Sequence, residues 1–163
     1  MIQIYDNFLS QAQNQCVIQY ALSAPYYYGE TDTPGGPVTG LVNVINKKHD
    51  IYRLFHYKTR DLVPEDMDLY RVYINCFSPS ERPYFHRDGD IGVTFLYYVN
   101  GTDELDDGGE TQIVDEGVIK GILPLHNRML QFDANMLHRA TTYRNNHRFT
   151  LAVKYGRLST TTV

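Results

Sequence analysis

The stretch 84-YFHRD-88 places a histidine and an aspartate two residues apart, and His138 and Arg148 follow further along the chain. Two imidazoles and one carboxylate form the facial triad that holds ferrous iron and leaves coordination positions open. A guanidinium is a permanent, fork-shaped cation that can bind a carboxylate through two parallel hydrogen bonds. The pattern therefore predicts a metal site at His86, Asp88 and His138, with Arg148 binding an organic acid beside it.

The chain around these residues reads as a series of short strands. From residue 68 onward, Val, Ile, Tyr, Phe and Thr are frequent, and turn residues separate the runs. Strands are expected at 68–77, 84–89, 91–99, 110–114, 118–123, 128–133, 137–143 and 147–155. Short antiparallel strands of this number are typical of a jelly roll, the double-stranded β-helix. The expected fold class is therefore an all-β core with an α cover.

The first part of the chain is expected to cover one sheet of this core. Residues 2–5 favour a strand, and Ser10 with Gln13 forms a capping box that begins a helix. A second helix is expected near 47–60. The prediction is a single domain, 1–163, with an N-terminal helical cover at 1–67 and a jelly-roll core at 68–156.

Strand geometry indicates which side chains can reach the metal. Successive side chains of a strand point to opposite faces, so His86 and Asp88 should face the same way. By the same rule Arg148 and Thr150 face the ligand cavity, while the apolar residues between and after them pack against the helices. A buried guanidinium needs an anion, and a small dicarboxylate supplies one. Tyr98 is expected to donate its hydroxyl to that carboxylate.

Composition narrows the classes of partner. The chain has 163 residues and a net charge of −4, with no run of Lys or Arg, which disfavours nucleic acid as a partner. Its N-terminus lacks a signal core, and no segment approaches the ~18 apolar residues that a membrane crossing needs. We therefore expect a cytoplasmic protein with no membrane partner. Cys16 and Cys76 are expected to be reduced, buried thiols.

Two loops are expected to border the opening of the cavity. The segment 29–42 is rich in Gly and Pro, and the segment 103–107 is acidic. Long loops in compact domains are often lids or binding elements, although a plain connector is equally compatible with the length of 29–42.

The motifs around the predicted ligands resemble those of the 2-oxoglutarate- and Fe(II)-dependent oxygenases, specifically the prolyl 4-hydroxylase-like branch. The resemblance runs from about Leu69 to Tyr155, over half of the chain. A Gly-Gly-Glu-Thr segment is a particular mark of this branch. The resemblance rests on 84-YFHRD-88, 94-TFLYYVN-100, 108-GGET-111, 130-LQF-132, His138 and 148-RFT-150.

The resemblance implies an enzyme that couples oxidative decarboxylation of 2-oxoglutarate by dioxygen (O2) to hydroxylation of an unactivated C–H bond. The predicted triad would bind Fe(II). Arg148 would pair with the distal carboxylate of 2-oxoglutarate, assisted by Thr150 and Tyr98. Ascorbate would serve as an accessory reductant, and the substrate would be a protein, a peptide or free proline. Halogenating relatives have a small residue in place of Asp88, so the carboxylate favours hydroxylation.

Two positions depart from the pattern of the family. Phe77 stands where many prolyl hydroxylases carry a tyrosine near the cosubstrate, and Ser80 replaces a glycine in the following turn. A hydroxyl contact is therefore missing, and Tyr98 or Asn75 is expected to replace it.

Two other functions are compatible with the residues. One is a non-catalytic jelly-roll module that binds a sugar or another small molecule, which would release no succinate from 2-oxoglutarate. The other is an oxygenase that acts on a modified nucleobase, for which a salt-dependent affinity for nucleic acid would be the sign.

Overall fold

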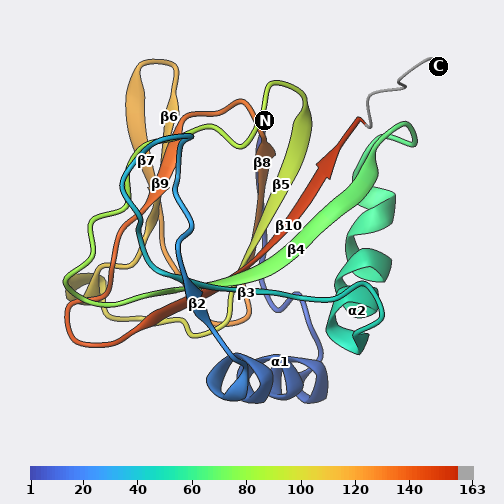
Figure 1. Ribbon diagram of the computed structural model, residues 1–163, viewed down its shortest axis with the longest axis horizontal. Coiled ribbons are helices and arrows are strands. Elements are labelled where there is room, and N and C mark those ends of the chain that lie inside the picture. The colour runs from blue at the N-terminus through green and yellow to red at the C-terminus, as the bar shows by residue number, and fades with distance from the viewer. Residues whose placement is uncertain (158–163) are drawn as a thin grey trace.

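The computed structural model describes residues 1–157 and consists of two β-sheets with helices against one of them (Figure 1). Residues 158–163, which the predicted domain includes, lie outside the described residues. The helices are α1 (Gln11–Ser23) and α2 (Asp50–Thr59), with short 3-10 turns at η1 (Arg60–Leu62) and η2 (Leu105–Asp107). The strands are β1 (Ile2–Tyr5), β2 (Tyr27–Tyr28), β3 (Leu41–Val44), β4 (Asp68–Phe77), β5 (Gly92–Tyr98), β6 (Thr111–Asp115), β7 (Val118–Ile122), β8 (Met129–Asp133), β9 (His138–Ala140) and β10 (Arg148–Gly156).

The strands form the two layers of a double-stranded β-helix, as predicted. The larger sheet has the order β1-β8-β5-β10-β4-β3-β2, and the smaller sheet has the order β7-β6-β9. Figure 1 shows α1 and α2 on one side of the larger sheet and the smaller sheet on its other side. No helix in residues 1–157 is long and apolar enough to cross a membrane.

Strand β10 shows how the sequence positions the site. Leu151 and Val153 are fully buried in the core between the larger sheet and the helices. The alternate residues Arg148, Thr150 and Lys154 point the other way, into a cavity between the sheets. This alternation is the period of an extended strand, so one strand builds the apolar core and a polar cavity wall together.

The helices begin at side-chain caps. In α1, Ser10 Oγ accepts a hydrogen bond from the backbone of Gln13, and the Gln13 side chain accepts one from Ser10, which is the predicted capping box. The second helix begins at Asp50 rather than near 47, because Nδ1 of His49 accepts a hydrogen bond from the backbone of Ile51 and caps it there.

One predicted strand is absent from the described residues: 84–89 is not a strand. His86 exchanges two backbone hydrogen bonds with His138, and the amide of Asp88 then turns to donate to the carbonyl of Ala134. The segment is thus held by a single β-bridge followed by a bend. In addition, β2 and β3 extend one edge of the larger sheet. β2 precedes the expected loop 29–42, and β3 begins within its last two residues.

The two cysteines are free thiols in different surroundings. Cys76 is buried, as predicted, but Cys16 is exposed on α1, so the expectation of two buried thiols is wrong for Cys16. Burial, followed by the nearby Glu81 carboxylate, raises the pKa of Cys76 to about 11.

We therefore expect iodoacetamide at pH 8 to alkylate Cys16 in the native protein and to leave Cys76 unmodified, because the thiolate is the reactive form. Mass spectrometry should show one adduct before denaturation and two after it. The variant Cys16→Ser should show none in the native state. Rapid native labelling of that variant would contradict the buried position of Cys76.

Candidate metal centre

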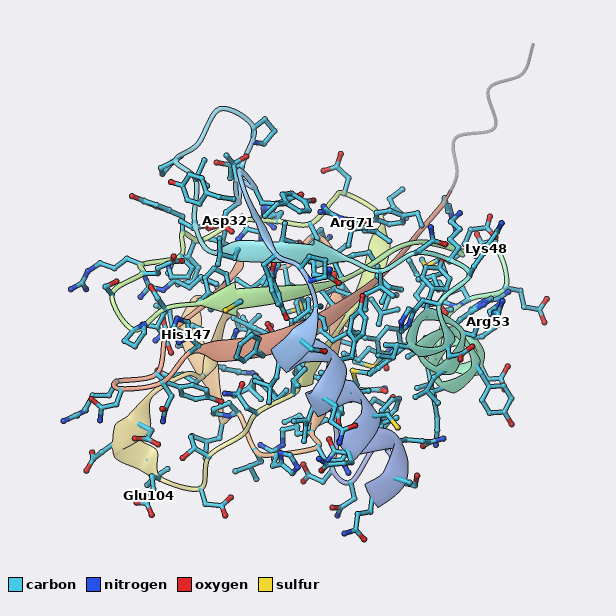
Figure 2. All side chains as sticks on the ribbon, turned by 60° about the horizontal axis from the view of Figure 1, so that its bottom comes forward. Asp32, Lys48, Arg53, Arg71, Glu104 and His147 are labelled. Atoms are coloured by element: carbon cyan, nitrogen blue, oxygen red, sulfur yellow. The ribbon has the colours of Figure 1, made fainter. Side chains whose placement is uncertain are left out.

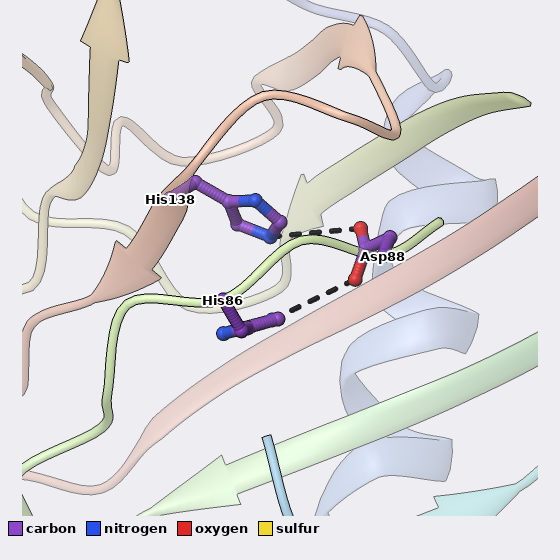
Figure 3. A group of neighbouring side chains, drawn as sticks. All are labelled: His86, Asp88 and His138. Carbon is purple, nitrogen blue, oxygen red and sulfur yellow. Dashed lines mark ion pairs between the residues drawn. The ribbon is translucent and has the colours of Figure 1, made fainter. Parts of the chain in front are cut away.

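The three predicted metal ligands converge at one point between the two sheets. His86 and Asp88 come from the bent segment after β4, and His138 begins β9 (Figure 3). One potential ligand atom from each residue lies within 4.8 Å of the others. Nε2 of His86 is 3.6 Å from Oδ1 of Asp88, and Nε2 of His138 is 3.5 Å from Oδ2. Two imidazoles and one carboxylate in this arrangement are the donor set of a facial triad.

The backbone fixes the ring orientation of both histidines. Nδ1 of His86 lies 3.0 Å from the carbonyl oxygen of Tyr84, and Nδ1 of His138 lies 2.9 Å from that of Met136. A carbonyl oxygen only accepts, so each Nδ1 carries a hydrogen and each Nε2 is turned toward Asp88. This is the orientation in which an imidazole binds a metal. The three residues therefore fit an Fe(II) ion.

The electrostatics of the triad also suit a metal. Burial is the main cause that lowers the pKa of His138 to about 4, with His86 and Lys154 adding to it. Burial alone would raise the pKa of Asp88, but Lys154 and the two histidines outweigh it and hold that pKa far below its usual range. At neutral pH the site thus contains an ionised Asp88 and a neutral His138, which are the forms that bind metal.

Arg148 is a buried cation without an anionic partner among the described residues. It is only 1% exposed, and burial lowers its pKa. Its hydrogen bonds go to the carbonyl oxygen of Gly109 at 2.7 Å, to Oγ1 of Thr111 at 3.0 Å and to Oγ1 of Thr150 at 3.3 Å. All three partners are neutral. A carboxylate would balance this buried charge, so the residues fit 2-oxoglutarate as well as the metal.

The triad and Arg148 line one cavity of about 280 Å³. Asn75 and Thr150 line it too, as the sequence indicated, and Phe77 lies beside Asn75 on β4. Other wall residues come from both sheets and the N-terminal segment; they include Arg71, Tyr73, Thr94, Leu96, Phe132, Ala140, Ala152 and Lys154.

Tyr98 differs from its predicted place. It is absent from the described wall of the cavity, and its hydroxyl donates to Oγ1 of Thr111 at 2.7 Å. Its ring centroid lies 5.5 Å from Cζ of Arg148. Tyr98 lies on the predicted face of β5, but β6 covers the end of that strand. Thr111 of β6 therefore accepts the hydrogen bond of the Tyr98 hydroxyl. The ring of Tyr98 thus packs against the guanidinium of Arg148. Its hydroxyl is not placed to contact a bound carboxylate.

Of the two loops expected at the opening, only 29–42 borders the cavity. It contributes Glu30 and Asp32, together with smaller residues, to the wall. No residue of the described acidic loop 103–107 belongs to that wall; Asp107 lines a separate depression instead. Figure 2 shows the separation, with Asp32 and Arg71 near the top and Glu104 at the lower left. The expectation for 103–107 is therefore wrong.

Lys154 and Asp32 are among the polar residues of the site that the sequence did not predict. Lys154 is 5% exposed and forms an ion pair with Asp88. Asp32 accepts hydrogen bonds from Oγ1 of Thr39 at 3.0 Å and from the amide of Tyr84 at 2.9 Å, which ties the 29–42 loop to the segment that carries His86. Lys154 shares a strand face with Arg148, so alternation could have found it. Nothing in the local sequence indicates the place of Asp32.

Several solved structures share this architecture. A prolyl hydroxylase from Trichoplax adhaerens, in complex with a hypoxia inducible factor peptide fragment, superimposes with a TM-score of 0.80 at 18% identity, covering 96% of this chain and 83% of that one. A Pseudomonas putida prolyl-4-hydroxylase gives 0.79 at 13% identity, covering 97% and 93%. The viral collagen prolyl hydroxylase of Paramecium Bursaria Chlorella virus-1, in its 2-oxoglutarate complex, gives 0.74 at 16% identity, covering 96% of both chains. At these identities the likeness shows the fold.

The search of curated proteins finds no relative of this chain. A family description does match the sequence itself: the 2OG-Fe(II) oxygenase superfamily, over residues 72–155. That match spans more than half of the chain and includes the triad and Arg148. The protein therefore belongs to the 2OG-Fe(II) oxygenase superfamily and is an oxidoreductase that depends on Fe(II), 2-oxoglutarate and dioxygen.

Proposed function

We propose that the protein is a prolyl-4-hydroxylase-like enzyme that hydroxylates an unactivated C–H bond in a protein, a peptide or free proline. The observation that carries the proposal is a buried Arg148, with no anionic partner among the described residues, in the same cavity as a His-Asp-His triad. The prolyl hydroxylases among the similar structures support this substrate class, including the one in complex with a peptide fragment. We place its activity in the cytoplasm, with ascorbate as an accessory reductant.

Each residue of the cavity has a role in this proposal. His86, Asp88 and His138 hold Fe(II), which supplies the oxidative chemistry once dioxygen and 2-oxoglutarate are bound. Arg148 pairs with the distal carboxylate of the cosubstrate and thereby orients its other end toward the triad. Thr150 and Asn75 add hydrogen bonds along the same wall. Tyr98 and Thr111 keep the guanidinium in place from behind.

The surrounding protein limits access of water to the site. The cavity lies between two sheets, and the 29–42 loop forms part of its wall. Glu30 of that loop pairs with Arg71 of β4 at 2.6 Å, which fastens the loop to the larger sheet. A closed, low-dielectric site strengthens the interaction of Arg148 with a carboxylate and protects reactive species from side reactions.

To test this, the protein is loaded anaerobically with Fe(II), ascorbate and 2-oxoglutarate, and dioxygen is then admitted in the presence of a proline peptide or free proline from a panel. We expect release of succinate together with a product heavier by one oxygen atom. Each peptide is matched by the same sequence with alanine in place of proline, which should gain no oxygen. Oxygen gain on a nucleoside with none on any proline substrate would overturn the substrate class. Absence of iron-dependent succinate release with every substrate would contradict the enzymatic role itself.

A further inference from the structure

Lys154 is a second buried cation in the cavity, on the same face of β10 as Arg148. Its side chain is 7% exposed, and its ammonium forms an ion pair with Oδ2 of Asp88. Nζ also lies 3.4 Å from Oγ1 of Thr94, the neighbouring residue on β5. Burying a lysine without a partner costs folding free energy, so the ammonium of Lys154 needs an anion beside it.

The two oxygens of Asp88 have different surroundings. Oδ2 accepts a 2.6 Å hydrogen bond from Oγ1 of Thr94 and also faces the ammonium of Lys154. Oδ2 also lies 3.5 Å from Nε2 of His138, whereas Oδ1 contacts neither Thr94 nor Lys154 and lies 3.6 Å from Nε2 of His86. Both oxygens thus face the triad, but only Oδ2 is also held by the strands of the larger sheet, and Oδ1 is left free of them.

The other carboxylates of the cavity already have partners. Glu30 pairs with Arg71 at 2.6 Å. Asp32 accepts hydrogen bonds from Thr39 and from the backbone of Tyr84. Among the described residues, Asp88 is therefore the carboxylate that Lys154 pairs with.

We propose that Lys154 is a positioning residue for Asp88: its ammonium, with the Thr94 hydroxyl, holds Oδ2 so that the carboxylate presents one oxygen to the metal. The same ammonium supplies the counter-charge of that carboxylate while the site is free of metal. A carboxylate held at one oxygen occupies one coordination position and leaves the others to the cosubstrate and dioxygen. This role rests on the metal role of Asp88 in the proposed function.

A double-mutant cycle in the metal-free protein measures the pairing. Lys154→Met leaves a buried carboxylate without its cation, and Asp88→Asn leaves a buried ammonium without its anion. Breaking a buried pair from either side is strongly destabilising, so each single variant should melt about 5–10 °C below the unaltered protein. The double variant removes both charges and should melt higher than Lys154→Met alone.

Metal binding provides a readout that a purely structural lysine would not change. Mn(II) serves as a redox-stable probe, and its addition should raise the melting temperature of Lys154→Met more than that of the unaltered protein, because the metal replaces the missing counter-charge. In the metal-loaded protein, an Asp88 released at Oδ2 can bind the metal through both oxygens and take a position that 2-oxoglutarate needs. The binding of 2-oxoglutarate should therefore weaken by about tenfold, the lower end of the effects that outer-shell changes have on metal sites. Lys154→Arg keeps the charge and should restore both values in large part.

Lys120 provides the matched control. It forms a 2.7 Å ion pair with Asp115 on the surface, so Lys120→Met should change neither the melting temperature nor the response to Mn(II) by a comparable amount.

An unchanged melting temperature of Lys154→Met, or strictly additive effects in the cycle, would overturn the proposal. If Lys154→Met does not fold, a folded double variant supports the pairing and an unfolded one overturns it. Failure of Mn(II) to stabilise the unaltered protein would count against the metal role of Asp88 in the proposed function. In that case the metal-free cycle still decides whether Lys154 is the counter-ion.

Discussion

Asp88→Ala is expected to lower substrate-coupled turnover by at least ~10³-fold, because it removes the only anion of the triad. Two neutral imidazoles would hold a divalent cation weakly, and the vacated position would admit water or another small ligand. The loss should appear in succinate release and in oxygen incorporation alike. Added Fe(II) should restore little of it, since His86 and His138 offer no replacement charge.

This variant needs two controls, because it also leaves Lys154 buried without its partner. The double variant Asp88→Ala/Lys154→Met removes that unpaired cation and should be equally inactive while melting higher. Asp90→Ala changes an exposed aspartate of the same segment and should keep nearly full turnover. Full activity of Asp88→Ala would refute the assigned metal role.

Arg148→Met is expected to weaken the binding of 2-oxoglutarate by about 100-fold or more, because truncating one side of a buried charge pair typically costs 2–5 kcal/mol. The affinity for Mn(II) alone should change little, since Arg148 is not part of the triad. The free energy of unfolding of the cosubstrate-free protein should fall by less than the binding energy of 2-oxoglutarate does. The reason is that the variant also removes a buried guanidinium without an anionic partner among the described residues.

Calorimetric titration with 2-oxoglutarate, in the presence of Mn(II), measures this effect directly. Arg148→Lys keeps the charge but loses the fork geometry, and it should lie between Arg148→Met and the unaltered protein. Arg144→Met alters an exposed arginine and serves as the matched control. An unchanged affinity in Arg148→Met would show that the distal carboxylate is bound elsewhere.

The parts of the fold that follow from local periodicity were predictable from the sequence. The alternation Phe149, Leu151, Val153 against Arg148 and Thr150 gave β10 its correct faces, and the capping box gave the correct start of α1. The triad was also brought together as predicted, although 84–89 is not a strand. The three side chains of the triad converge because one β-bridge between His86 and His138 fixes the backbone of the segment 84–89.

Features that depend on how distant segments meet could not be predicted. The hydroxyl of Tyr98 was expected at the ligand, but Thr111 of the other sheet takes it. Asp32 reaches the site only because its loop folds across the opening, and the acidic loop 103–107 lies elsewhere. Lys154 is an intermediate case: its face was predictable, while its pairing with Asp88 depends on where the bent segment lies.

The position of β10 has a consequence for the protein during its synthesis. This strand lies between β5 and β4 in the larger sheet, although both of those strands precede it in the chain. Before residues 148–156 leave the ribosome, the nascent chain holds two incomplete half-sheets, each with an unpaired edge that is open to wrong partners. Truncation before β10 should therefore yield an insoluble product rather than a smaller folded unit.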